Sequence, residues 1–180
     1  MLTFFKSFPE LQTNRLRLRQ IIADDQPGIF AGLSHPEVIK YYGVEYKTYR
    51  DTQLQMDWYE ELLRNKTGMW WAICTPENPA LMGVCGFYNM QEQHRKAELG
   101  YWLLPAYWQQ GIMHEALTTI LPFGFTQLNL HRIEAFVETE NTASSKLLEK
   151  LGFRHEGTMI ECEIKKGNFI SLKIYARLNK

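Results

Sequence analysis

The sequence predicts an α/β domain in which strands and helices alternate along the chain. Residues 97–104 alternate apolar side chains between two faces as a strand does, and from Ile112 the apolar residues recur at helical spacing. A strand pattern at 131–138 is likewise followed by a helical pattern at 141–152. A chain of 180 residues suits one sizeable core, so we predict a single domain over residues 1–180.

The first strand and the first helix are predicted close to the N-terminus. Residues 15–20 indicate a strand because Leu16 and Leu18 alternate with arginines. Asp25 and Pro27 predict the start of a helix, since an acidic cap and a fixed φ both favour a first helical turn.

A second helix is predicted after Thr48, which resembles the first residue of a capping box. This helix is expected to place Leu54, Trp58 and Leu62 on one apolar stripe. Gly68 is expected to end it, because glycine readily adopts the left-handed conformation at a helix C-terminus.

Two pairs of strands complete the predicted sheet. Residues 69–75 and 81–89 indicate strands joined by the proline-rich turn at 76–79. Two last strands are predicted near 154–163 and 169–176, on either side of a turn that contains Gly167. No internal repeat or low-complexity tract interrupts this order.

The segment that connects residue 97 to residue 117 predicts an anion site. A helix that starts just after Gly111 leaves its first backbone N–H groups unpaired, and its dipole adds positive character there. Glu98 lies on the strand that leads to this site. Pro122 predicts that the helix kinks or ends early, near Leu121.

Three segments together resemble the GNAT superfamily of acyl-CoA-dependent N-acetyltransferases. They are R-L-R-L-R at 15–19, Y-W-Q-Q-G-I-M at 107–113 and N-T-A-S-S-K-L-L-E-K-L-G-F at 141–153. The likeness is strongest to the branch that acetylates the N-termini of ribosomal proteins. It implies a mixed, strongly twisted sheet with helices on both faces and a V-shaped splay between the two central strands. One departure concerns the phosphate loop, which is usually Q/R-x-x-G-x-G/A. Here Trp108 occupies the first position of this motif and Met113 the last, so only Gly111 matches it.

The resemblance also implies a site for acetyl-CoA, the acetyl donor. Backbone N–H groups at 109–113 are expected to bind the pyrophosphate, the backbone at 102–104 to pair with the pantetheine arm, and an N–H near Leu103 to polarise the thioester carbonyl. Asn141 is expected to bind the arm as well. The donor-binding residues are therefore Trp102, Leu103, Leu104, Gln109, Gln110, Gly111, Ile112, Met113 and Asn141.

Glu98 and Ser144 are the candidate catalytic residues. Glu98 is expected to be the general base, directly or through one water, with Glu138 as the residue to test in its place. Many family members carry a tyrosine seven residues after the asparagine to protonate the leaving thiolate, but here that position is Leu148. Ser144 is the substitute that we predict. Each residue also has a structural alternative: a surface strand residue for Glu98 and a residue of the first helical turn for Ser144. Asn141 has one as well, since its side chain can cap the helix that follows.

The predicted reaction is transfer of an acetyl group from acetyl-CoA to a primary amine, most readily a peptide or protein N-terminus of the ribosomal type. One alternative acceptor is a small-molecule amine such as a polyamine, an amino sugar or an amino-acid-like metabolite. A second alternative is a non-catalytic acyl-CoA-binding sensor. Tyr41 and Tyr42 are candidate walls of an acceptor groove. The histidines lack metal-ligand spacing, so no metal is predicted.

Composition narrows the partners and the compartment. Lys plus Arg equals Asp plus Glu at 20 each, which gives no electrostatic reason to bind nucleic acid or an anionic membrane. The cysteines Cys74, Cys85 and Cys162 are scattered and predict buried thiols in a reducing compartment. Residues 1–10 lack the basic start and apolar core of a signal peptide. We therefore expect a cytoplasmic monomer or homodimer.

Overall fold

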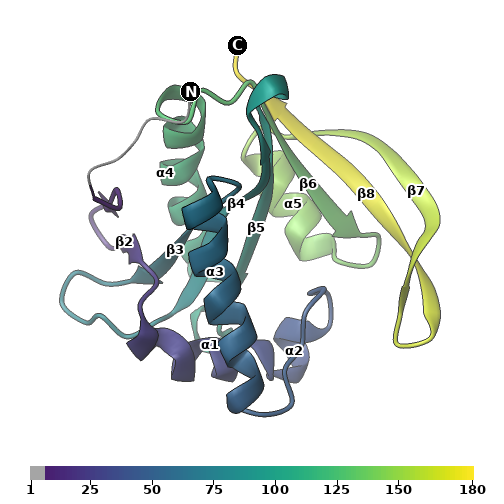
Figure 1. The fold of residues 1–180 in the computed structure, drawn as a ribbon. Coiled ribbons are helices and arrows are strands. Elements are labelled where there is room, and N and C mark those ends of the chain that lie inside the picture. Colours follow the sequence, from purple (N-terminus) through teal and green to yellow (C-terminus); the bar gives the residue numbers. More distant parts are fainter. Residues whose placement is uncertain (1–6) are drawn as a thin grey trace.

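The structure is a computed structural model that describes residues 7–180. The prediction that residues 1–10 form no signal peptide therefore falls largely on residues 1–6, which lie outside the described residues. Eight strands form one mixed sheet in the order β1-β2-β3-β4-β5-β6-β8-β7 (Figure 1). The strands are β1 (Leu11–Gln12), β2 (Arg17–Gln20), β3 (Met69–Cys74), β4 (Gly83–Gln91), β5 (Lys96–Leu103), β6 (Arg132–Glu138), β7 (Arg154–Lys165) and β8 (Asn168–Leu178). All neighbours are antiparallel except β5 and β6, which run parallel.

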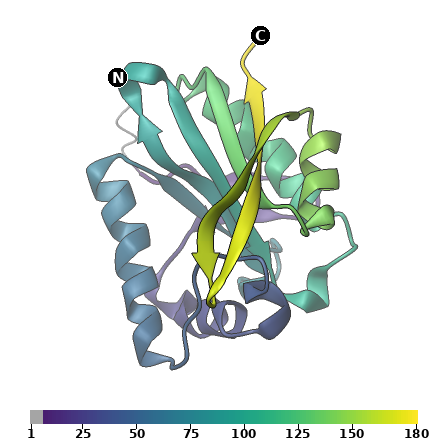
Figure 2. The same ribbon diagram turned by 90° about the vertical axis from the view of Figure 1, so that its right-hand side faces the viewer.

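Helices cover both faces of the sheet, as predicted (Figure 2). The helices are α1 (Gln26–Leu33), α2 (Pro36–Ile39), α3 (Gln53–Asn65), α4 (Ile112–Thr126) and α5 (Thr142–Lys150). The alternation of β5 explains the two layers: Ala97, Leu99 and Leu103 pack in the core under α4 and α5, whereas Trp102 packs in the core under α1 and α3. Among residues 7–180, no helix combines the length and the apolar character needed to cross a membrane.

The stripe predicted on α3 is only partly correct. Leu54 is 67% exposed, whereas Gln55, Tyr59 and Leu62 face the core. A polar residue can take the inward position because the Gln55 side chain accepts a hydrogen bond from the Tyr46 hydroxyl at 3.2 Å. The helix also ends before Gly68, at Asn65, with Lys66 in the left-handed conformation.

Two further expectations need correction. Of the two outcomes predicted at Pro122, a kink or an early end near Leu121, the early end is wrong. The helix continues to Thr126, because Phe123 and Phe125 after the proline are buried and their burial offsets the missing backbone donor. Cys162 is exposed on β7, so only two of the three thiols are buried as predicted.

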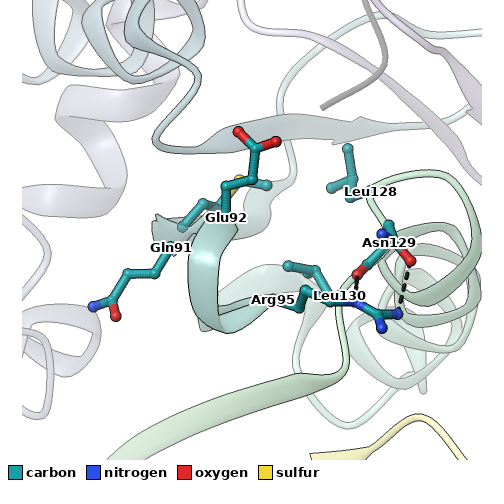
Figure 3. A pocket seen from close by; sticks show the side chains of 7 residues that line it. Gln91, Glu92, Arg95, Leu128, Asn129 and Leu130 are labelled. Atoms are coloured by element: carbon teal, nitrogen blue, oxygen red, sulfur yellow. Dashed lines mark hydrogen bonds between the residues drawn. The ribbon is translucent and has the colours of Figure 1, made fainter. Parts of the chain in front are cut away.

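A cavity of about 240 Å³ lies where the turn between β4 and β5 meets the segment after α4 (Figure 3). Two hydrogen bonds join the Arg95 guanidinium to the backbone and side-chain oxygens of Asn129 at 2.8 and 2.7 Å. This cavity lies at the C-terminal end of α4, whereas the predicted anion site lies at the N-terminus of the same helix. It is therefore separate from the candidate site described below.

Candidate functional site

The candidate site is built on a divergence between β5 and β6, the two parallel strands. They pair at only three positions, of which Glu98 with Glu134 is the last. Beyond it, β5 remains paired with β4 as far as Leu103, and β6 remains paired with β8 as far as Glu138. The two strands separate like the arms of a V, widening downward in Figure 1. We call this opening the divergence.

The inner edge of β5 presents backbone groups to the divergence. The Leu104 N–H donates to the Met82 carbonyl at 2.9 Å, so it belongs to the ladder with β4. In an antiparallel ladder the direction of the N–H groups alternates, so Trp102 also turns its N–H toward β4, whereas Leu103 turns its N–H toward the divergence. The Leu103 carbonyl accepts a hydrogen bond from the Trp108 indole at 2.9 Å. Of the three predicted strand residues, Leu103 is therefore the one whose N–H faces the opening.

Gly111 caps the N-terminus of α4 at the far end of this edge. Its φ of +76° lies in the left-handed region, which favours glycine. A Cβ built on Gly111 would lie 3.6 Å from a guanidinium nitrogen of Arg15, an ordinary contact, so the space beside the loop is open. The backbone N–H groups of the first helical turn point out of the helix at this place, and they can bind an anion.

Arg15 ties the loop before α4 to the helix itself. Its guanidinium donates to the Gln110 carbonyl at 3.2 Å and to the Glu115 carboxylate at 2.7 Å. Desolvation raises the pKa of Glu115, but hydrogen bonds from Thr13 and Arg15 outweigh this and lower that pKa overall. Arg15 thus compensates an acidic charge that would otherwise oppose an anion at the helix N-terminus.

Glu98 lies half-buried on the face of the sheet that α1 and α3 cover, at the closed end of the divergence. A bulge in β4 places Asn89 at a φ of +47°, and its amide donates to the Glu98 carboxylate at 2.8 Å. Desolvation raises the pKa of the neighbouring Tyr88, and the charge and hydrogen bonding of Glu98 raise it further. Tyr42 and Glu163 make smaller electrostatic contributions that raise the pKa of Tyr88 in the same direction.

The same face continues across β6 and β8. Ala135 and Val137 are buried under α5, so Glu134, Phe136 and Glu138 point to the opposite face, and Ile174 of β8 is the register partner of Phe136. We call the set Glu98, Glu134, Phe136, Glu138 and Ile174 the acceptor face. Two of its carboxylates form ion pairs. The Glu134 carboxylate lies 2.6 Å from the Arg132 guanidinium and 3.4 Å from the Lys96 ammonium, and the Glu138 carboxylate pairs with the Lys165 ammonium.

The hairpin of β7 and β8 contacts the segment after α2 that carries Tyr41 and Tyr42. The Lys165 ammonium donates to the Lys40 carbonyl at 2.6 Å, and the Lys166 ammonium lies 2.7 Å from the Glu45 carboxylate. Tyr42 packs against the core under α3, and burial raises its pKa. Tyr42 therefore lies on the side of the sheet to which the acceptor face belongs, whereas the contact of Tyr41 is with the Lys40 ammonium, 5.2 Å from its ring centroid.

The helix after β6 brings Asn141 and Ser144 to the other arm of the divergence. The Asn141 side chain caps α5 by accepting the Ser144 N–H at 3.1 Å, so the structural alternative predicted for Asn141 is present. Leu148 is fully buried in the core and leaves its position without a polar group. The Ser144 hydroxyl lies 2.6 Å from the hydroxyl of Tyr101 on β5. The alternation of β5 predicts the face of the sheet to which the Tyr101 side chain points, but it does not predict that Ser144 is its hydrogen-bond partner.

Divergent parallel strands with an open edge, beside a glycine-capped helix N-terminus, are the features of an acyl-CoA-dependent transferase. The comparisons specify the class further. A family model described as "Acetyltransferase (GNAT) domain" matches residues 15–154, and the chain belongs to this family. It is a GNAT N-acetyltransferase, and its donor is acetyl-CoA.

Known proteins of this class resemble the chain over almost all its length. Uncharacterized N-acetyltransferase YoaA of Bacillus subtilis (strain 168) is 36% identical over 170 residues, which cover 94% of this chain and 96% of that protein. RimL, a ribosomal L7/L12 alpha-N-protein acetyltransferase solved in complex with coenzyme A, has a TM-score of 0.83 at 20% identity, covering 92% and 95% of the two chains. Spermidine N-acetyltransferase from Vibrio cholerae, solved with CoA and spermine, has a TM-score of 0.82 at 23% identity, covering 92% and 96%. At these identities the two solved structures show a shared fold.

Proposed function

We propose that the protein transfers the acetyl group of acetyl-CoA to the α-amino group of a peptide or protein N-terminus. The observation that carries this choice of acceptor is the charge balance of the acceptor face. Glu134 and Glu138 are already paired with lysine or arginine, whereas Glu98 contacts the neutral amide of Asn89. A polyamine carries several cations and is best recognised by several uncompensated carboxylates. A peptide N-terminus carries one ammonium group, which a single carboxylate matches.

Apolar side chains on the acceptor face support the same acceptor. Phe136 is 37% exposed, and its register partner Ile174 is partly exposed. These side chains offer contact to the apolar parts of a peptide. Among the solved relatives above, RimL is named for a protein N-terminus and the Vibrio cholerae enzyme for spermidine, so both acceptors belong in the test.

The donor is assigned to the divergence and to the N-terminus of α4. The backbone amides at 109–113 bind the pyrophosphate, the edge of β5 that faces the divergence pairs with the pantetheine arm, and the Leu103 N–H polarises the thioester carbonyl. Asn141, which already caps α5, contacts the same arm. The features that support this assignment are the left-handed Gly111, the open space beside it and the ladder direction at Leu104.

In the proposed reaction the neutral amine attacks the thioester carbonyl directly. A new N–C bond forms, the C–S bond breaks, and its electron pair stays on sulfur. Glu98 takes the proton of the amine, directly or through one water. The Ser144 hydroxyl stabilises the thiolate by a hydrogen bond. Glu138 is held in an ion pair with Lys165, whereas Glu98 contacts the neutral amide of Asn89, so Glu98 is the residue that we assign as the base.

The test is a comparison of acceptors at equal concentrations of amine. Peptides with free N-termini, the same peptides with blocked N-termini and one internal lysine, and spermidine are incubated with acetyl-CoA and the purified chain. We expect kcat/KM for free N-termini to exceed that for spermidine by at least about tenfold, or 1.4 kcal/mol. Mass spectrometry should place the acetyl group on the α-nitrogen.

A preference for spermidine would contradict the proposed acceptor and leave the acetyltransferase class intact. Binding of coenzyme A without acetylation of any amine would instead favour the sensor.

A further inference from the structure

The hydrogen bond between Tyr101 and Ser144 joins the two arms of the divergence. Tyr101 lies on β5 beyond Glu98, the last residue of that strand paired with β6, and Ser144 lies in the first turn of α5. Their hydroxyl oxygens are 2.6 Å apart, although the residues are 43 positions apart in the chain. The bond therefore spans the divergence two residues along β5 from Leu103, whose N–H is assigned to the thioester carbonyl.

Local structure fixes both partners of this bond. Tyr101 points to the α4 and α5 face because Leu99 and Leu103, two positions on either side of it, are buried there. Ser144 is fixed by the cap of Asn141, which accepts its backbone N–H. The Leu148 side chain has no proton donor. The phenol that reaches the first turn of α5 belongs to Tyr101 of β5.

The proton of the Tyr101 phenol stays in place at neutral pH. Burial raises the pKa of Tyr101 to about 12, and the hydrogen bond with Ser144 opposes this increase only in part. Either hydroxyl can be the donor in this bond. In the arrangement in which the protonated phenol donates to the Ser144 oxygen, the hydroxyl hydrogen of Ser144 is available for another acceptor. Hydrogen bonds in such a chain polarise and strengthen each other.

We propose that Tyr101 is a positioning residue that directs the Ser144 hydroxyl hydrogen to the sulfur of the departing coenzyme A. This inference rests on the proposed acetyl transfer and on the role of Ser144 in it. As the C–S bond breaks, the sulfur gains the electron pair and accepts the hydrogen bond from Ser144. Tyr101 keeps its own proton throughout, and the proton released by the amine goes to Glu98. Tyr101 thus acts through Ser144 and does not contact the reacting atoms.

The first test is a double-mutant cycle on the full chain. Ser144→Ala should lower kcat about tenfold with little change in the KM for acetyl-CoA, and Tyr101→Phe should lower kcat about fivefold, as loss of one neutral hydrogen bond predicts. In Ser144→Ala the further change Tyr101→Phe should have no effect on kcat. Tyr175→Phe is the matched control, because that phenol also donates to α5, to Glu149 at 3.0 Å. It should leave kcat unchanged.

The second test does not require turnover. The affinities for coenzyme A and for its desulfo analogue are measured at about pH 7 and about pH 9.5, on either side of an ordinary thiol pKa. If the pair receives a thiolate, raising the pH should favour coenzyme A over the analogue by several-fold. Both Tyr101→Phe and Ser144→Ala should remove this preference.

Three results would overturn the inference. They are an unchanged kcat in Tyr101→Phe, a loss that adds fully to that of Ser144→Ala, and an unchanged preference for the thiolate in Tyr101→Phe. If the wild type acetylates no amine, the proposed function fails, and the binding experiment still decides the role of Tyr101.

Discussion

Replacing Gly111 by alanine separates backbone strain from donor binding. Gly111 has a φ of +76° and Gly152, at the end of α5, has a φ of +80°. The nearest atoms to a Cβ at these positions are 3.6 Å and 3.9 Å away, so neither substitution causes a clash. Each change should cost about 1–2 kcal/mol, the penalty for an L-residue in the left-handed region.

The two variants should therefore lose similar stability but differ in binding. For a chain of this length, each should lower Tm by about 2–8 °C. Only Gly111→Ala moves the backbone amides that are assigned to the pyrophosphate. Calorimetry should show coenzyme A bound about tenfold more weakly to this variant, or 1.4 kcal/mol, and with unchanged affinity to Gly152→Ala.

The outcome can refute the reasoning in two ways. Full affinity in a folded Gly111→Ala protein would exclude the loop before α4 as the phosphate site. An equal loss of affinity in Gly152→Ala would mean that general destabilisation weakens binding, and the assignment of the loop would lose its support.

Three further predictions test the other parts of the site. Glu98→Gln should lower kcat about 10²-fold or more, with partial recovery at high pH where more of the amine is neutral; an unchanged pH–rate profile would exclude Glu98 as the base. Arg15→Ala should weaken binding of coenzyme A, as measured by calorimetry, because the Glu115 carboxylate is then uncompensated. Adding Glu115→Gln removes this charge and should restore part of the affinity. No recovery would mean that Arg15 acts only by holding the loop. Asn141→Ala should cost about 1 kcal/mol and lower Tm by about 2–4 °C through loss of the helix cap, and an unchanged Tm would contradict that role.

The pH dependence of stability follows from the lowered pKa of Glu115. A carboxylate whose pKa is lowered by folding stabilises the protein above its unfolded pKa, and this contribution is lost as the pH falls through the folded value. Glu115→Gln should therefore reduce the loss of stability on the acid side, as followed by denaturant unfolding at several pH values. An unchanged slope in this variant would contradict the effect of Thr13 and Arg15 on the Glu115 carboxylate.

The sequence by itself determined the features that depend on neighbouring residues. The alternation of β5, the helix that begins after Gly111 and the cap of α5 by Asn141 were all predicted, because each follows from periodicity or from a side chain that bonds within its own turn. The inward position of Gln55 was not predicted, and the sequence left open whether α4 ends at Pro122 or continues through it. Both depend on packing against distant parts of the core, which local propensity does not contain.

Only the tertiary structure decided which groups meet at the site. The point at which β5 and β6 separate is set by their partners β4 and β8, so no pattern within either strand records it. The same holds for the amide of Asn89 on Glu98, the pairing of Glu138 with Lys165 and the phenol of Tyr101 on Ser144. The physical reason is that a strand pattern fixes the face to which a side chain points, whereas sheet order, register and bulges fix the partner that it reaches there.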